Sequence, residues 1–330
     1  MSKKEKRQRA VLIVAMLVFA LIAICSGLKI LETVIFPHNE LVSEEKPSKT
    51  IVRDGVAYYP RQDITVVMVL GIDQFGPMQD SGSYKNNGAS DMVMLLIFDE
   101  TAKEYSVMQL NRDTMLEMTV LGIRGENAGT DFGQLALAHT YGSGLEDSSE
   151  NVKNTLMNFI HGLSIDYYVT MNMDAIPIMN DAVGGVTVTV TDDFSEVNPS
   201  ITMGEVTLRG DQVIDFVRTR KNVGDQKNVT RMERQKEYME SFLSTLKEAS
   251  QENVNLAISL YDQVSPYIVT DCSAETLSGM MKRYVDFTFK EVITPEGENR
   301  ISDGYYEFYV DEEKMDELIV DVFYSTKNQE

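Results

Sequence analysis

The sequence predicts an α/β fold: a three-layer α-β-α domain with a central mixed β-sheet, preceded by a single N-terminal transmembrane helix. Continuous apolar runs alternate with amphipathic helical patterns, which is typical of layered α/β domains. One uncharged segment near the N-terminus also has the length of a membrane span. The chain has 330 residues, of which 43% are hydrophobic and 25% charged. This length and balance suit a folded chain rather than a disordered one.

The N-terminus has the composition of a membrane anchor. Residues 1–9 carry a net charge of +4, and nineteen uncharged residues follow from Ala10 to Leu28. As a helix, this segment would reach about 28 Å, close to the hydrocarbon thickness of a bilayer. Basic residues before the span favour a cytoplasmic N-terminus. We therefore predict a cytoplasmic tail (1–9), a transmembrane helix (10–35) and a single-pass protein of the cell membrane whose domain is extracellular.

Two other interpretations of the N-terminus stay open. A cleaved signal peptide has a shorter apolar core and a small-x-small cleavage site, and no clean Ala-x-Ala follows this core. A lipoprotein site at Cys25 calls for a small residue before it, where Ile24 stands. An uncleaved anchor agrees better with the sequence than either alternative.

The segment after the span predicts an extracellular stalk over residues 36–62. It contains three of the eight prolines and several charges, without a sustained hydrophobic period. The folded domain is expected over 63–325, followed by a short C-terminal tail over 326–330. No linker or internal repeat divides the domain.

Within the domain, the strands are predicted from runs that are apolar on both faces, which is typical of central strands covered by helices. These runs are 64–73, 92–98 and 105–110. The segments 167–173 and 186–190 are predicted as further strands, and Gly184-Gly185 supplies a turn before the last of them. The helices are predicted from amphipathic patterns, and Asp174 is a good residue to begin one. The helical patterns cover 148–160, 174–183, 229–246, 254–264, 274–285 and 312–323.

The charge and the cysteine and histidine counts exclude several classes of function. The net charge is −21, whereas nucleic-acid binding needs a basic surface. Three histidines far apart in the sequence argue against a His-rich zinc site. Cys25 and Cys272 are too few for a disulfide framework or a Cys₄ metal site. We therefore expect no nucleic acid among the partners.

A basic cluster stands out in this acidic chain: residues 218–236 carry a net charge of +5. If Phe216–Arg220 is extended, Arg218 and Arg220 point to the same side. On a helix, Arg231 would share a face with Arg234 and Gln235. Guanidinium groups converging from a strand and a helix suit the oxygens of a phosphate. A solvated charge run with surface salt bridges is the alternative.

Acidic residues at the predicted strand ends form the second candidate cluster. Asp73 ends the first run, Asp91 begins the second, and Asp113 follows the third beside Arg112. Ligands of open α/β sheets gather where strand ends meet loops. Two or three carboxylates there could hold Mg²⁺, which prefers oxygen ligands and often bridges to phosphates. Helix caps and turn residues are the alternative for any one of these acids.

Taken in order, these stretches resemble the LytR–CpsA–Psr family of Gram-positive envelope proteins. No single motif decides this, but their order and spacing match over roughly residues 63–325. The matching stretches are VVMVLGID (66–73), ASDMVMLLIF (89–98), VMQLNRDTM (107–115), QLALAHTYGSG (134–144), DYYVTMNMDAI (166–176), DAVGGVTVTV (181–190), LRGDQVIDFVRTR (208–220), NVTRMERQ (228–235) and, more weakly, TDCSAETL (270–277).

The resemblance implies a membrane-anchored, Mg²⁺-dependent phosphotransferase. Such an enzyme takes an anionic glycopolymer from an undecaprenyl-pyrophosphate carrier and joins it to peptidoglycan. The helices at 148–160 and 174–183 are then the candidates for lining an apolar groove for the polyprenyl tail. The resemblance and the residue patterns together assign catalysis to Arg112, Asp113 and Asp73, pyrophosphate binding to Arg218, Arg220, Arg231, Arg234 and Gln235, and the metal to Asp73 and Asp91.

The sequence also departs from the family pattern. Gln74, Ala89, Asn111 and Gln134 stand where the family often has Arg, Arg, Pro and Lys. The missing cations leave open a non-catalytic scaffold that binds polyprenyl phosphate and glycan. The sequence also does not decide whether Asp113 or Asp73 would act as the base.

Overall fold

The structure is a computed structural model. It describes residues 50–219, 221–224, 234, 237–238, 241–242, 244–246, 248–249, 253, 256–273, 276, 279–280, 283–284, 287–302 and 305–326. The predicted tail (1–9) and transmembrane helix (10–35) lie outside these residues. Among the helices that the structure describes, none has the length and apolar character needed to cross a bilayer.

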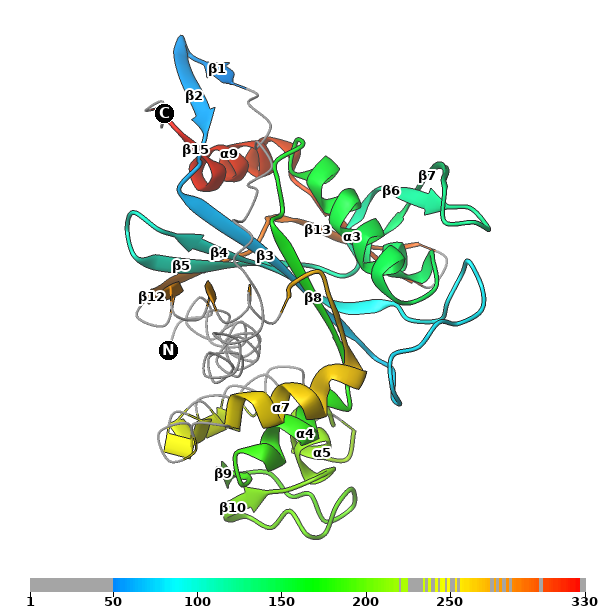
Figure 1. Cartoon of the computed structure of the whole chain (residues 1–330), viewed down its shortest axis with the longest axis vertical. Helices are drawn as coiled ribbons and strands as arrows, with labels where there is room; N and C mark the ends of the chain where they lie inside the picture. Colours follow the sequence, from blue (N-terminus) through cyan, green and yellow to red (C-terminus); the bar gives the residue numbers. More distant parts are fainter. Residues whose placement is uncertain are drawn as a thin grey trace, which may run out of the picture.

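A six-stranded mixed sheet forms the centre of the fold, as predicted, with the strand order β11-β8-β3-β4-β5-β12 (Figure 1). The strands β3 and β8 are parallel, as are β5 and β12, and the other neighbours are antiparallel. Four of the predicted strand segments form four neighbouring strands of this sheet. The strands are β3 (Ile64–Ile72), β4 (Ser90–Asp99), β5 (Glu104–Leu110), β8 (Tyr167–Asn172), β11 (Ile268–Thr270) and β12 (Thr288–Ile293).

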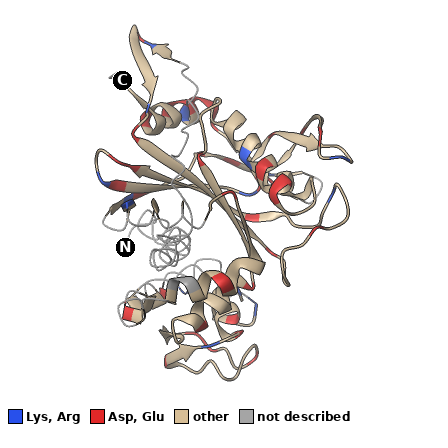
Figure 2. Cartoon of the chain, viewed as in Figure 1, with Lys and Arg blue, Asp and Glu red and all other residues tan. Residues whose placement is uncertain are grey.

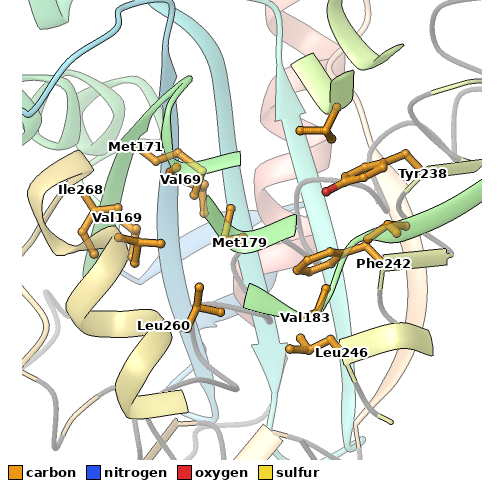
Figure 3. Packing of buried hydrophobic residues seen from close by; sticks show 14 of the residues in the cluster. Val69, Val169, Met171, Met179, Val183, Tyr238, Phe242, Leu246, Leu260 and Ile268 are labelled. Carbon is orange, nitrogen blue, oxygen red and sulfur yellow. The ribbon is translucent and has the colours of Figure 1, made fainter. Parts of the chain in front are cut away.

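Helices cover both faces of the sheet, and each face has its own hydrophobic core. Alternate residues of one strand serve the two cores, since Val67 and Val69 belong to one and Met68 and Leu70 to the other. The first core contains residues of α4 (Ala175–Ala182), α5 (Gln212–Arg218) and α7 (Leu256–Val264), and Figure 3 shows part of this packing. The second contains residues of α3 (Glu146–Phe159) and α9 (Glu312–Phe323).

Three two-stranded units lie outside the central sheet, and two of them were not predicted. The pair β6 (Met115–Leu121) and β7 (Asn127–Gln134) packs beside α3, and β13 (Gly297–Ser302) pairs with β14 (Tyr305–Val310). The predicted strand β9 (Val186–Val190) pairs with β10 (Gly204–Leu208) instead of joining the central sheet.

The turn before β9 needs glycine. Gly184 and Gly185 have φ angles of +89° and +90°, in the left-handed region that glycine adopts freely. A Cβ atom on Gly185 would also lie 2.9 Å from the carbonyl oxygen of Leu208 on β10. The glycine pair therefore lets β9 approach β10 closely after α4.

The second half of the predicted stalk is part of the folded domain. Residues 51–53 (β1, Ile51–Arg53) and 56–60 (β2, Val56–Pro60) form an antiparallel pair, and β15 (Tyr324–Ser325) pairs with the other edge of β2. The backbone N–H of Arg61 also donates to the Phe323 carbonyl at 2.8 Å. These strands are held by a partner near the other end of the chain, which a local pattern does not reveal.

The predicted helices agree with the structure with small differences at their ends. Residues described within 229–246 and 274–285 are helical, although parts of both segments lie outside the described residues. Asp174 precedes α4, but its side chain does not cap that helix. Its Oδ2 instead accepts a hydrogen bond from the backbone N–H of Gly76, in the loop after β3.

Candidate functional site

The strand register brings the predicted acids to one end of the central sheet. Because β3, β4 and β5 are antiparallel neighbours, the end of β3, the start of β4 and the end of β5 lie together. Ile72 pairs with Ser90, whereas Gly71 pairs with Met92. Asp91 is therefore the extra residue of a β-bulge, a feature that re-aims side chains and is common beside active sites.

Arg112 bridges two of the acids at this end. Its Nη1 donates to Asp91 Oδ1, and its Nε lies 3.5 Å from Asp113 Oδ1. The side chains of Arg112 and Asp91 are 36% and 37% exposed, so the pair is open to a ligand. The predicted Arg-Asp pair and Asp91 thus form one cluster.

Arg218 lies at the same end of the sheet. It belongs to α5, a helix whose buried residues are part of the first hydrophobic core. Its Nη2 donates to Asp73 Oδ2 at 2.8 Å, and its guanidinium lies 5.7 Å from the centre of the exposed Phe75 ring. The prediction of an extended Arg218–Arg220 segment is wrong for Arg218, which is the last residue of α5. The buried side chains of Val213 and Phe216 are three residues apart, a helical spacing.

The loop around Asp113 is held by hydrogen bonds from three segments. Asn111 Oδ1 accepts from the Asp113 backbone N–H at 3.0 Å, which forms an Asx turn. Gln134 Nε2 donates to Asp113 Oδ1 at 3.1 Å and to the Tyr306 carbonyl at 2.6 Å. The backbone N–H of Phe308 donates to the Asp113 carbonyl at 2.8 Å. Gln134, one of the departures from the family pattern, therefore positions Asp113 against β14.

Burial raises the pKa of the Asp91 carboxyl above its ordinary value of 3.8. Arg112 opposes this shift, while the negative charges of Asp73 and Asp113 add to it. Asp73 and Asp113 are thus each close enough to Asp91 to repel its negative charge. A positive charge arriving between them would relieve this repulsion.

The chemistry of these groups fits a magnesium ion shared with a phosphate ligand. Within the described residues, no group of three or more Asp, Glu, His or Cys side chains is placed to hold a metal ion alone. Mg²⁺ is often held by only one or two carboxylates, with substrate phosphates and water completing its shell. Asp73 and Asp91, which repel each other, are suited to such an arrangement.

Arg234, which was predicted to bind the same anion, is buried and paired inside the protein. Its side chain is 5% exposed and pairs with Asp192 at 2.6 Å. Its Nε and Nη2 donate to the carbonyls of Phe216 and Thr219, at the C-terminal end of α5. The guanidinium is thus committed to fixing the helix that ends in Arg218. The other predicted anion-binding residues, Arg220, Arg231 and Gln235, lie outside the described residues.

The helices predicted to line one apolar groove lie on opposite faces of the sheet (Figure 1). Val152 and Leu156 of α3 belong to one core, and Ala175 and Met179 of α4 to the other. The predicted pairing of these helices around one polyprenyl tail is therefore wrong. The sheet alternates its side chains between its faces and separates the two helices.

Sequence reasoning missed two contributors to the site. The exposed ring of Phe75 stacks on Arg218. The sequence does show an aromatic residue two positions after Asp73, which could have drawn attention to it. The contact between Gln134 and the backbone of Tyr306 joins residues 172 positions apart, so no local pattern could have shown it.

Comparisons with known proteins found similar sequences. The model of the LytR_cpsA_psr family matches residues 31–322. A polyisoprenyl-teichoic acid–peptidoglycan teichoic acid transferase TagU from Oceanobacillus iheyensis is 24% identical over 285 residues, which cover 85% of this chain and 81% of the relative.

Solved structures show the same fold. TagV from B. subtilis aligns with a TM-score of 0.56 and 21% identity, over 79% of this chain and 96% of that one. A structure of TagT bound to LIIa-WTA aligns with a TM-score of 0.55 and 21% identity, over 86% and 98% of the two chains.

Proposed function

Because the chain belongs to the LytR_cpsA_psr family, we propose that it transfers an anionic glycopolymer from an undecaprenyl-pyrophosphate carrier to peptidoglycan during cell-wall assembly. Relatives named as teichoic acid transferases, which use peptidoglycan as the acceptor, support this class of reaction. The observation that carries the proposal is the cluster of Asp73, Asp91, Asp113, Arg112 and Arg218 at one end of the sheet.

The two arginines are suited to bind the pyrophosphate. In the ligand-free protein each guanidinium is paired with a carboxylate, yet Arg112 and Arg218 remain 36% and 47% exposed. A bidentate guanidinium can turn from a carboxylate to a phosphate with little loss, because both present two oxygens. Their positive charges would stabilise the negative charge that develops on the transferred phosphoryl group.

In the proposed reaction, a sugar hydroxyl of peptidoglycan attacks the phosphorus that carries the glycopolymer. A new P–O bond forms to the sugar, the bond to the bridging oxygen breaks, and undecaprenyl phosphate leaves. We infer that Asp113 would accept the hydroxyl proton. Its Oδ1 is held by Gln134, and its Oδ2 makes no hydrogen bond to any residue that the structure describes.

Asp73 and Asp91 would hold Mg²⁺ together with the pyrophosphate oxygens. The bound ion would supply charge neutralisation at the phosphates. Transfer of the arginines from carboxylates to phosphates would leave these two carboxylates available. The charge balance of the site is then maintained as the substrate binds.

The proposal also covers the attachment of the domain to the membrane and the position of the polyprenyl tail. The predicted span (10–35) would anchor it to the cell membrane with the catalytic domain outside. The polyprenyl tail would lie on the side of the sheet that carries α5, because Arg218 enters the site from there. This position for the tail replaces the predicted apolar groove lined by α3 and α4.

The full chain in detergent, with an undecaprenyl-pyrophosphate-linked oligomer and peptidoglycan, tests the proposal. We expect Mg²⁺-dependent transfer that EDTA abolishes and that Arg218→Ala lowers at least about a hundredfold, as for loss of a transition-state donor. Arg300→Ala is the matched control, because its ion pair with Glu298 is on the exposed β13.

An Arg218→Ala variant that turns over like the wild type would overturn the proposal. Lipid that co-purifies with a protein showing no turnover in Mg²⁺ would assign the scaffold function instead. Release of the polymer without an acceptor would identify a hydrolase, with water in place of the sugar hydroxyl.

A further inference from the structure

A polar groove lies beside α3, away from the cluster of arginines and aspartates. It has a volume of about 440 Å³, within the usual range for small-ligand sites. One wall is α3, and the other is the β6–β7 pair, which lies alongside it in Figure 1. Its lining includes Thr119 and Leu121 of β6 and Asn151, Asn154 and Asn158 of α3.

The groove is rigid because α3 is fastened to the backbone of β6. The backbone N–H of Thr119 donates to Thr155 Oγ1 at 3.4 Å, and its carbonyl accepts from Asn151 Nδ2 at 2.9 Å. Asn151 Nδ2 also donates to the Ala138 carbonyl at 2.8 Å. Two carbonyl partners fix the orientation of this amide, and its Oδ1 is buried without a hydrogen-bond partner in the described structure.

Helix stability does not explain the asparagines of α3. Asn is a poor helix former, because its side chain competes for backbone hydrogen bonds. Asn154 and Asn158 are exposed, share a face at i, i+4 spacing, and make no side-chain hydrogen bond to any described residue. Two amides, each able to donate and accept, are therefore presented to the groove by a rigid helix.

The charge of the groove selects the class of ligand. Its lining includes the acids Asp147 and Glu150 but no Lys or Arg. The ribbon of α3 carries several acidic residues, coloured red in Figure 2. An anionic, phosphate-rich polymer would be repelled. Amides that donate and accept suit the hydroxyl and acetamido groups of an uncharged sugar chain.

We propose that this groove binds the neutral glycan strand of the acceptor, an inference that rests on the proposed function. Thr119 follows Asp113 by six residues, five of them along β6, so the groove begins within about 20 Å of Asp113. A strand whose hydroxyl reacts beside Asp113 would continue along β6 into the groove. Long acceptors would therefore use it and disaccharides would not reach it.

Binding of chitohexaose, an uncharged chain of N-acetylglucosamine, to the full-length protein in detergent tests the proposal by calorimetry without any donor. We expect the wild type to bind it and Asn154→Ala/Asn158→Ala to weaken the Kd at least tenfold. Alanine favours the helix, so this variant keeps its fold. Gln263→Ala is the matched control, an exposed residue of α7 on the other face of the sheet, and should bind like the wild type.

In the transfer assay, the same double variant should raise KM for long glycan acceptors and leave kcat unchanged, with no change for a disaccharide acceptor. Equal Kd values for the double variant and the wild type, no binding by the wild type, or tight binding of a glycerol phosphate hexamer at these asparagines would overturn the proposal. Because the binding arm needs no donor, its failure is distinct from failure of the proposed transfer, which the Arg218 variant measures.

Discussion

The guanidinium of Arg218 holds the carboxylate of Asp73 at 2.8 Å, although the two residues are 145 positions apart. Arg218 is the last residue of a helix in one core, and Asp73 directly follows a central strand. The contact thus joins the end of α5 to the end of β3, two parts of the chain that are distant in the sequence. Both side chains are substantially exposed, so the pair contributes little to stability and is accessible to a ligand.

Arg218→Lys should separate charge from geometry. Lysine keeps the positive charge but loses the planar fork that binds two oxygens. We expect kcat to fall about tenfold or more, the value of one charge-assisted hydrogen bond. The melting temperature should stay nearly unchanged, because an exposed pair contributes at most about 1 kcal/mol. Wild-type turnover by this variant would show that only the charge of Arg218 matters.

Gln134→Leu should lower kcat without unfolding the protein. The substitution removes the hydrogen bond that holds Asp113 Oδ1 and the link to the Tyr306 carbonyl. With Asp113 free to rotate, we expect a loss of about tenfold in kcat and little change in KM for the donor. Gln134→Glu places a carboxylate beside Asp113 and should be worse. Equal kcat values for Gln134→Leu and the wild type would remove Gln134 from the positioning of Asp113.

Asp91→Asn should stabilise the ligand-free protein at neutral pH while it removes transfer. The pKa of Asp91 is raised, chiefly by burial, so its ionised form disfavours the folded state. This penalty is present above the folded-state pKa and disappears as the pH falls through that value toward 3.8. We expect the variant to melt at a higher temperature than the wild type at about pH 7, with the difference vanishing as the pH falls below 3.8.

Thermal melts of both proteins across this pH range are the measurement for Asp91. Addition of Mg²⁺ with a pyrophosphate ligand should stabilise the wild type more than the variant, because only the wild type keeps both carboxylates. A variant that melts lower than the wild type at pH 7 would contradict the unfavourable environment assigned to Asp91.

Arg234→Met should destabilise the fold by about 3–5 kcal/mol, the usual cost of breaking a buried ion pair. It leaves Asp192 without its partner at 2.6 Å and the carbonyls of Phe216 and Thr219 without donors. Urea unfolding measures the effect, and Arg300→Ala on the exposed hairpin should change the unfolding free energy by less than about 1 kcal/mol. Similar values for the two variants would refute the role of Arg234 in fixing α5.

The central strands could be predicted because burial on both faces of a strand requires a continuous apolar run in its sequence. The strands β3 and β4 are buried on both faces, and their apolar runs show it. The β6–β7 pair could not be predicted in the same way. Its strand Asn127–Gln134 is mostly exposed, contains two glycines, and is stabilised by pairing and by α3 rather than by its own pattern.

The part of the candidate site that lies at the ends of central strands could be predicted from the sequence. Asp73, Asp91 and the Arg112–Asp113 pair follow or begin apolar runs, and the antiparallel register brings them together. The bulge at Asp91 depends on the pairing of two strands and leaves no local signal. The role of Arg234 also leaves no local signal. The sequence shows Arg234 among other cations, but it does not show that its side chain is buried and paired with Asp192.

The small sheet β1-β2-β15 has a consequence for how the domain can be rearranged. Ile51 pairs with Tyr58 and Ser325 with Tyr59, on opposite edges of the same strand. Two strand spacings separate them, about 10 Å. Because β1 and β15 are parallel with β2 between them, a linker that joins these positions has to cross over β2 and needs about a dozen residues. The domain is thus suited to circular permutation, in which the backbone is closed here and opened at a distant surface loop without disturbing the sheet that carries the site.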